Sequence, residues 1–111
     1  MESILTSIKK MLGITEEYIH FDTDIIICIN SVFLNLTQLG VGPVDGFSIS
    51  DDTSTWYDFI GDTKKFEAVK TYVYLKVKLL FDPPQSSGAT EAIDRQIKEL
   101  EWRLNVAAES T

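Results

Sequence analysis

The sequence is poor in the residues that build several common protein classes. Its 111 residues include one cysteine, Cys28, so no disulfide can form within the chain. Three prolines and six glycines are too few for a collagen-like or low-complexity chain. No apolar run reaches the roughly 20 residues of a membrane-spanning helix, and the first residues lack a signal-peptide pattern. We therefore expect a chain that is made in the cytoplasm and does not insert into a membrane.

Positive charge is also scarce. Ten basic residues stand against seventeen acidic ones, which leaves a net charge of −7. A uniformly basic surface for nucleic acid is therefore excluded, because phosphate binding needs clustered lysine and arginine. The composition, 44% hydrophobic and 24% charged, is typical of a soluble globular protein, and the length fits a single helical domain over residues 1–111.

Apolar residues recur at helical spacing in two segments of the first 40 residues. The first segment, 3–12, ends before Gly13, and its last turn holds Lys9 and Lys10, which complement the helix dipole. The second runs from Asp22 to the stop at Gly40, and we expect acidic capping at its N-terminus. Its β-branched start also fits a buried strand, but the helical period continues for about four turns and favours a helix.

Helical periodicity stops between residues 41 and 55, where glycine, serine, aspartate and threonine dominate. This composition predicts a long central loop, and its Asp-Gly pair also allows a minor β-hairpin. Long loops are often functional. We expect this one to place apolar side chains on a neighbouring chain.

The second half of the chain predicts three further helices. A short one spans 56–60, a longer one runs from 62 or 63 to 81, and the last spans about 90–107. The last helix has a narrow apolar seam with three acid-before-base pairs on its other faces, and Trp102 lies off that seam. Together the segments predict an all-α fold, a small bundle of four to five helices with a long central loop or minor β-hairpin.

Charge is unevenly divided along the chain. Residues 1–61 carry −7 (nine acids, two lysines), residues 62–81 carry +3 (two acids, five lysines), and residues 82–111 carry −3 (six acids, three bases). This division favours charge-complementary packing between copies of the chain. An ordinary mixed surface is the alternative.

The sequence contains no strong catalytic or metal-binding motif. His20 lies beside Asp22 and Asp24, but helix capping accounts for these carboxylates, and no second ligand set occurs elsewhere. Cys28 falls in the predicted core helix, which argues against a thiolate nucleophile. The lysines of 64–78 spread over several helix faces and include no arginine, so tight DNA binding is not expected. We expect no enzyme activity, metal or cofactor.

Four segments carry a family resemblance: 8–14, 38–43, 80–84 and 99–105 (IKKMLGI, QLGVGP, LFDPP and ELEWRLN). Taken together they resemble the head-tail connector (adaptor) family of tailed bacteriophages and prophages. The resemblance implies a small, mainly helical protein that forms a ring, usually a dodecamer, below the portal of a DNA-filled capsid. It implies as partners the portal protein and the next neck or head-completion protein, and it transfers no active site.

We therefore predict a non-enzymatic connector subunit of the virion neck, through which genomic DNA passes without sequence-specific binding. An acidic lumen would keep that DNA mobile. The candidate interaction residues lie in the central loop, beside it and on the last helix: Val44, Phe47, Ile49, Trp56, Trp102 and Arg103. For the two tryptophans, a position in the core or at its edge is the alternative. Two alternatives are a small acidic regulatory module of the antitoxin or anti-repressor type, and a hydrolase that uses His20.

Overall fold

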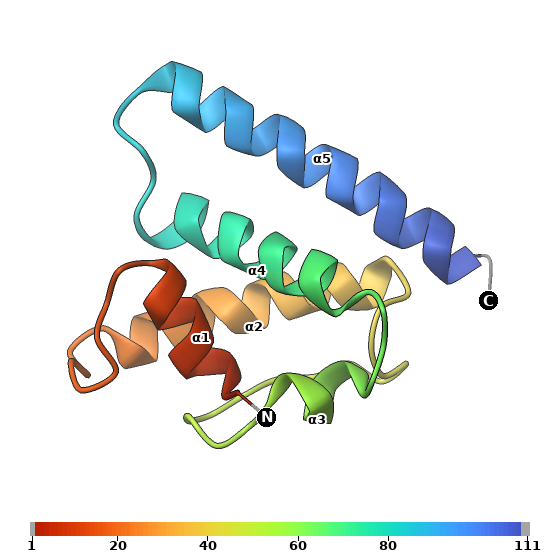
Figure 1. Cartoon of the computed structure of the whole chain (residues 1–111), viewed down its shortest axis with the longest axis horizontal. Helices are drawn as coiled ribbons and strands as arrows, with labels where there is room; N and C mark the ends of the chain where they lie inside the picture. The colour runs from red at the N-terminus through yellow and green to blue at the C-terminus, as the bar shows by residue number, and fades with distance from the viewer. Residues whose placement is uncertain (1, 110–111) are drawn as a thin grey trace.

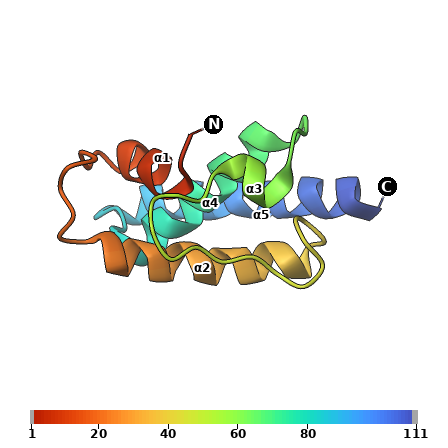
Figure 2. The same ribbon diagram turned by 90° about the horizontal axis from the view of Figure 1, so that it is seen from below.

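The computed structural model describes residues 2–109 and is built from five helices. These are α1 (Ile4–Met11), α2 (Asp22–Gln38), α3 (Trp56–Ile60), α4 (Phe66–Phe81) and α5 (Ser87–Glu109). α4 lies at the centre and packs against both α2 and α5 (Figure 1). Turned by 90°, the molecule shows α2 along one side and α1 and α3 along the other (Figure 2). The all-α prediction is confirmed.

α1 forms where the sequence predicts it. The Ser3 side chain accepts a hydrogen bond from the Thr6 N–H, and the helix is followed by Gly13 at a positive φ of 83°. Ser3 also bridges to Thr55, and the Ile4 N–H donates to the Ser54 carbonyl at 2.9 Å. These bonds attach the start of the chain to the segment before α3.

α2 is the central core helix that its periodicity predicts, but its N-terminus is not capped as expected. Asp22 and Asp24 lie in the first helical turn, and the N-cap position is Phe21, which makes no side-chain capping bond. The two carboxylates can stabilise the helix dipole there. The prediction of side-chain capping is wrong because both aspartates lie inside the helix, after the N-cap position, where Asp22 forms an ion pair with Lys9 instead.

The long central loop is confirmed and the minor hairpin is wrong, since residues 2–109 contain no strand beyond the single bridge at Ser3. The loop is instead fixed by a side chain. The Asn30 amide accepts from the Ile49 N–H at 2.8 Å and donates to the Ile49 carbonyl at 2.9 Å. Both backbone groups of Ile49 are thereby satisfied without a partner strand.

The boundaries of the last two long helices differ from the prediction. α4 begins at Phe66 rather than 62 or 63, because the Thr63 hydroxyl accepts from the Lys65 N–H in a turn before the helix. α5 begins at Ser87 rather than near 90, because the Ser86 hydroxyl accepts from the Ala89 N–H and so satisfies a free donor of the first turn.

α5 packs on α4 through the predicted seam. Ile97 and Leu104 are 4% and 2% exposed, while Ile93 and Leu100 are partly buried. A hydrogen bond of 2.7 Å from the Tyr72 hydroxyl to a Glu101 carboxylate oxygen adds a polar tie between the helices. Two of the three predicted ion pairs on the outer faces form, Asp94 with Lys98 and Glu99 with Arg103.

Candidate interaction surfaces

The central loop places its candidate contact residues in three different environments. Val44 is 94% exposed at the loop tip. Phe47 is half-buried, with its ring centroid 5.1 Å from that of Phe59. Ile49 is 4% exposed and held by Asn30. The expectation that Ile49 faces a neighbouring chain is therefore corrected, because its side chain belongs to the core of its own subunit.

Trp56 is likewise a core residue rather than a surface contact. Its side chain is fully buried at the start of α3, and its indole N–H donates to the Ser7 hydroxyl at 2.7 Å. The same hydroxyl donates to the Ile4 carbonyl at 3.0 Å. Since a buried indole needs a partner for its N–H, this arrangement accounts for Trp56 inside the subunit.

Trp102 and Arg103 lie on the outer side of α5. Trp102 is 68% exposed, as its position off the seam predicts. Arg103 is also exposed, and its guanidinium pairs with Glu99 at 2.8 Å. Of the six sequence candidates, Val44, Trp102 and Arg103 are thus exposed, Val44 in the central loop and the other two on α5.

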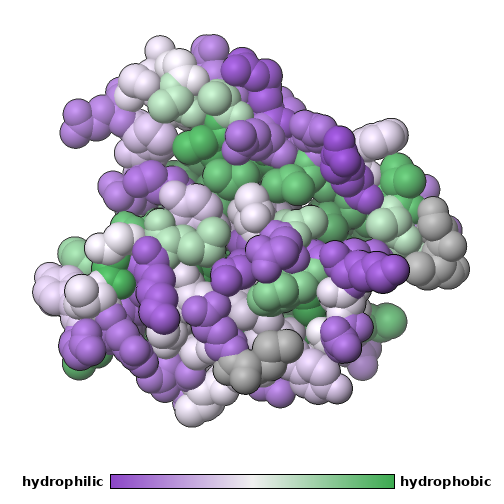
Figure 3. Space-filling model, in the orientation of Figure 1, coloured by the Kyte–Doolittle hydropathy of each residue, from purple (hydrophilic) through white to green (hydrophobic). Residues whose placement is uncertain are grey.

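An apolar strip follows the groove between α4 and α5 (Figure 3). A cavity of about 430 Å³ in this groove is lined on α4 by Ala68, Thr71 and Leu75 and on α5 by residues around Leu100. α5 therefore covers α4 incompletely and leaves part of its apolar face in contact with solvent.

The loop between α1 and α2 (residues 12–21, the α1–α2 loop) forms a surface that the sequence reading missed. It is held at its base by Lys9, whose side chain is only 3% exposed. The Lys9 ammonium lies 2.8 Å from an Asp22 carboxylate oxygen and donates to the Glu16 carbonyl at 3.0 Å. Lys9 thus joins α1, the loop and α2, beyond its expected effect on the helix dipole.

The same loop presents large side chains to solvent on a rigid support. Ile19 is 71% exposed and Tyr18 is 49% exposed. In the same loop, the centroid of the Phe21 ring lies 4.7 Å from that of His20 and 5.3 Å from that of Phe81 at the end of α4. The sequence signal for this surface is the pair Tyr18 and Ile19, which directly follows two glutamates and lies outside any helical pattern.

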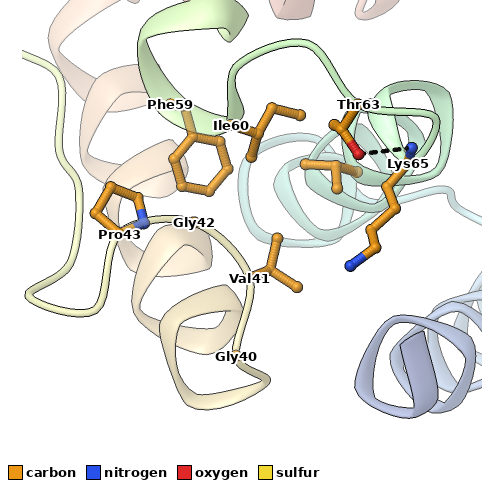
Figure 4. Close-up of a pocket in the computed structure, with 9 residues that line it drawn as sticks. Gly40, Val41, Gly42, Pro43, Phe59, Ile60, Thr63 and Lys65 are labelled. Carbon is orange, nitrogen blue, oxygen red and sulfur yellow. Dashed lines mark hydrogen bonds between the residues drawn. The ribbon is translucent and has the colours of Figure 1, made fainter. Parts of the chain in front are cut away.

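A pocket of about 290 Å³ opens at the other end of α2 (Figure 4). We call it the Gly40–Lys65 pocket; it is lined by Gly40, Val41, Gly42, Pro43, Phe59, Ile60, Thr63, Lys65 and Val69. Gly42 has a φ of 84°, and a β-carbon there would lie 2.4 Å from the Phe59 ring, so only glycine permits this close approach. The Lys65 side chain extends from the turn before α4 toward Val41.

Comparison with known proteins gives one match. The sequence model of a family described as phage connector protein matches residues 4–111. The chain belongs to this family. No curated protein and no solved structure matches it. The connector family is structural rather than catalytic, in agreement with the resemblance carried by the four sequence segments.

The residues that were candidates for catalysis or metal binding make structural contacts in this connector. Asp22 is paired with Lys9, and the His20 ring packs on Phe21. Burial, followed by the nearby Asp24 carboxylate, raises the pKa of the Cys28 thiol above its usual value. The described part of the chain holds no cluster of three or more potential metal ligands, and none of its helices is long and apolar enough to cross a membrane.

The fold pairs two lysines of α4 with acidic residues of the same subunit. On α4, Lys70 pairs with Glu2 at 3.0 Å and Lys78 pairs with Asp82 at 3.0 Å. Part of the positive charge expected to face another copy is therefore neutralised within the subunit. The stretch between Lys10 and Lys64 contains nine acids and no lysine or arginine.

Proposed function

We propose that this connector is a head-tail adaptor subunit that assembles as a ring, with twelve copies as the expected number, below the portal in the virion neck. Family membership over residues 4–111 is the observation that carries this proposal. The subunit would be made in the host bacterial cytoplasm, and its partners would be the portal protein and the next neck or head-completion protein. No enzyme activity or cofactor is part of the proposal.

The surface of the subunit supports an assembly role. Large apolar side chains are exposed on several elements, including Ile27 and Leu34 on α2, Leu80 on α4 and Trp102 on α5. Exposed apolar residues on many sides are expected where a subunit has neighbours of its own kind and further partners above and below.

Mass measurement with and without the portal tests the ring. The purified chain is examined by light scattering and negative-stain microscopy, alone and after mixing with purified portal rings. We expect closed rings in at least one of the two conditions. A chain that remains a monomer or dimer in both would refute the proposal and favour the regulatory alternative.

Trp102 is proposed as a contact to the portal or neck protein. Trp102→Ala is expected to weaken binding to portal rings without changing the thermal midpoint, because the side chain is 68% exposed. Tyr57→Ala is the matched control, since Tyr57 is an exposed aromatic residue (54%) on α3. If both variants bind portal rings equally well, Trp102 is not part of the contact.

The acidic central loop is proposed to face the DNA conduit, where negative charge would keep the duplex from binding tightly. The carboxylates of Asp51 and Asp58 hold the local backbone, because they accept hydrogen bonds from Thr53 and Thr55. Asp45 and Asp52 are exposed and have no such bond among the described residues. Asp45→Asn/Asp52→Asn should therefore leave assembly intact and alter DNA retention in virions; unchanged retention would contradict an acidic lumen.

A further inference from the structure

The two ends of α2 carry surfaces of complementary chemistry. Before the helix, the α1–α2 loop exposes Ile19 and Tyr18 together with Glu16 and Glu17. After the helix comes the Gly40–Lys65 pocket, with apolar walls and one lysine. The 17 residues of α2 separate these surfaces by about 25 Å at 1.5 Å per residue. Both ribbon views show the α1–α2 loop at one end of α2 and the start of the central loop at the other (Figures 1 and 2).

We propose that the α1–α2 loop of one copy docks into the Gly40–Lys65 pocket of the next copy. Ile19 occupies the pocket against Val41 and Phe59, and the carboxylates of Glu16 and Glu17 face the ammonium groups of Lys64 and Lys65. This contact deepens the proposed ring function and rests on it.

Charge identifies a second copy as the occupant. Lys65 is the only charged residue among those that line the pocket, and within residues 2–109 neither Lys64 nor Lys65 forms an ion pair. The Glu16 and Glu17 carboxylates are equally unpaired in that part of the chain. Lys64 lies beside the pocket and not in its lining, as do Asp62 and Glu67, which flank the two lysines in sequence. Opposite charges at the two ends of α2 favour contact between the loop of one copy and the pocket of the next. They disfavour contacts of loop with loop or of pocket with pocket.

The loop is held in shape before it binds. The buried Lys9 side chain donates to the Glu16 carbonyl, and the Phe21 ring packs against the rings of both Tyr18 and Phe81. A preformed loop loses little conformational entropy on docking, so more of its contact energy contributes to affinity.

The position of the two surfaces also agrees with a ring. Because they lie at opposite ends of α2, the contact joins different patches on the two copies and is head-to-tail. Such heterologous contacts repeat from copy to copy and close into a ring when the rotation between subunits permits it.

A charge-swap experiment tests the contact. The loop variant is Glu16→Lys/Glu17→Lys, and the pocket variant is Lys64→Glu/Lys65→Glu. Each variant alone faces like charge across the contact, so we expect self-association to weaken about tenfold or more in sedimentation velocity, with or without portal rings. In a mixture of equal amounts, every contact can pair a lysine loop with a glutamate pocket or the reverse. We expect the mixture to recover association close to that of the wild type.

The control is Lys76→Glu/Arg95→Glu, which changes the net charge as much as the pocket variant does but on residues outside the contact. It should associate like the wild type. Circular dichroism checks that each variant is helical, and Ile19→Ser provides a second variant that leaves all charges in place and should also weaken association.

The outcomes separate this contact from the ring itself. If wild-type rings form and the loop, pocket and Ile19 variants form them equally well, or if the mixture fails to recover, the docking proposal is overturned while the ring stands. If the wild type forms no ring under any condition, the proposed function fails and the docking contact fails with it.

Discussion

Removing the charge of Asp22 should destabilise the subunit far more than removing that of its neighbour Asp24. Asp22 lies 2.8 Å from the ammonium of Lys9, whose side chain is 3% exposed. In Asp22→Asn this ammonium keeps the Glu16 carbonyl as an acceptor but loses the one carboxylate that pairs with it within residues 2–109. A buried charge without a partner is costly because neither water nor an opposite charge compensates for its lost hydration.

The magnitude follows from the burial of the two partners. Breaking a fully buried ion pair costs about 3 to 5 kcal/mol. The Asp22 side chain is 26% exposed, so water can partly replace the carboxylate, and we expect a loss of about 2 to 3 kcal/mol in the free energy of unfolding. Asp24→Asn removes a carboxylate from the same helical turn without an ion pair, and its cost should stay within about 0.3 to 1 kcal/mol.

Urea unfolding followed by tryptophan fluorescence measures both variants, with an unchanged slope required for comparison. A double-mutant cycle with Lys9→Met isolates the pair, and we expect a coupling energy above about 1 kcal/mol. Equal losses for Asp22→Asn and Asp24→Asn, or a coupling energy near zero, would refute the conclusion that Lys9 depends on Asp22.

Three further predictions concern the core and its surroundings. Trp56→Ala should lower the free energy of unfolding by about 3 to 5 kcal/mol, whereas Trp102→Ala should change it by less than about 0.5 kcal/mol; similar losses would contradict their assignment to core and surface. Gly42→Ala should cost about 1 to 3 kcal/mol in thermal unfolding because of its positive φ and the nearby Phe59 ring, and a neutral result would contradict that close approach. Burial, and then the Glu101 carboxylate, raises the pKa of Tyr72 above 10, so the folded state keeps a proton that the unfolded state loses. Stability should therefore fall as pH rises above about 10, and less so in Tyr72→Phe; identical profiles would contradict this assignment.

Much of the fold could be predicted because its signals are local. Gly13 and Gly40 end helices through a positive φ, which few other residues adopt, and Pro83 follows the end of α4. The starts of α4 and α5 were less predictable. Thr63 bonds the Lys65 N–H in the turn before α4 and does not cap the helix, and of the neighbouring Ser86 and Ser87 it is Ser86 that bonds the first turn of α5.

The interaction surfaces were only partly predictable. Trp102 could be placed outside because a narrow seam at helical spacing defines which side of α5 faces α4. In the central loop no periodicity indicates which side chains turn inward, so the burial of Ile49 depends on Asn30, 19 residues away in the sequence. The pairing of Lys9 with Asp22 similarly joins two helices across a loop that local rules do not describe.

The sequence by itself determined the helical class, the long central loop, the negative net charge and membership of the connector family. These properties depend on composition, on spacing within single elements and on motifs along the chain. Only the tertiary structure decided which apolar residues remain exposed, because burial depends on partners distant in sequence. It also placed the loop of Ile19 and the pocket of Lys65 at opposite ends of one helix, which no local pattern specifies.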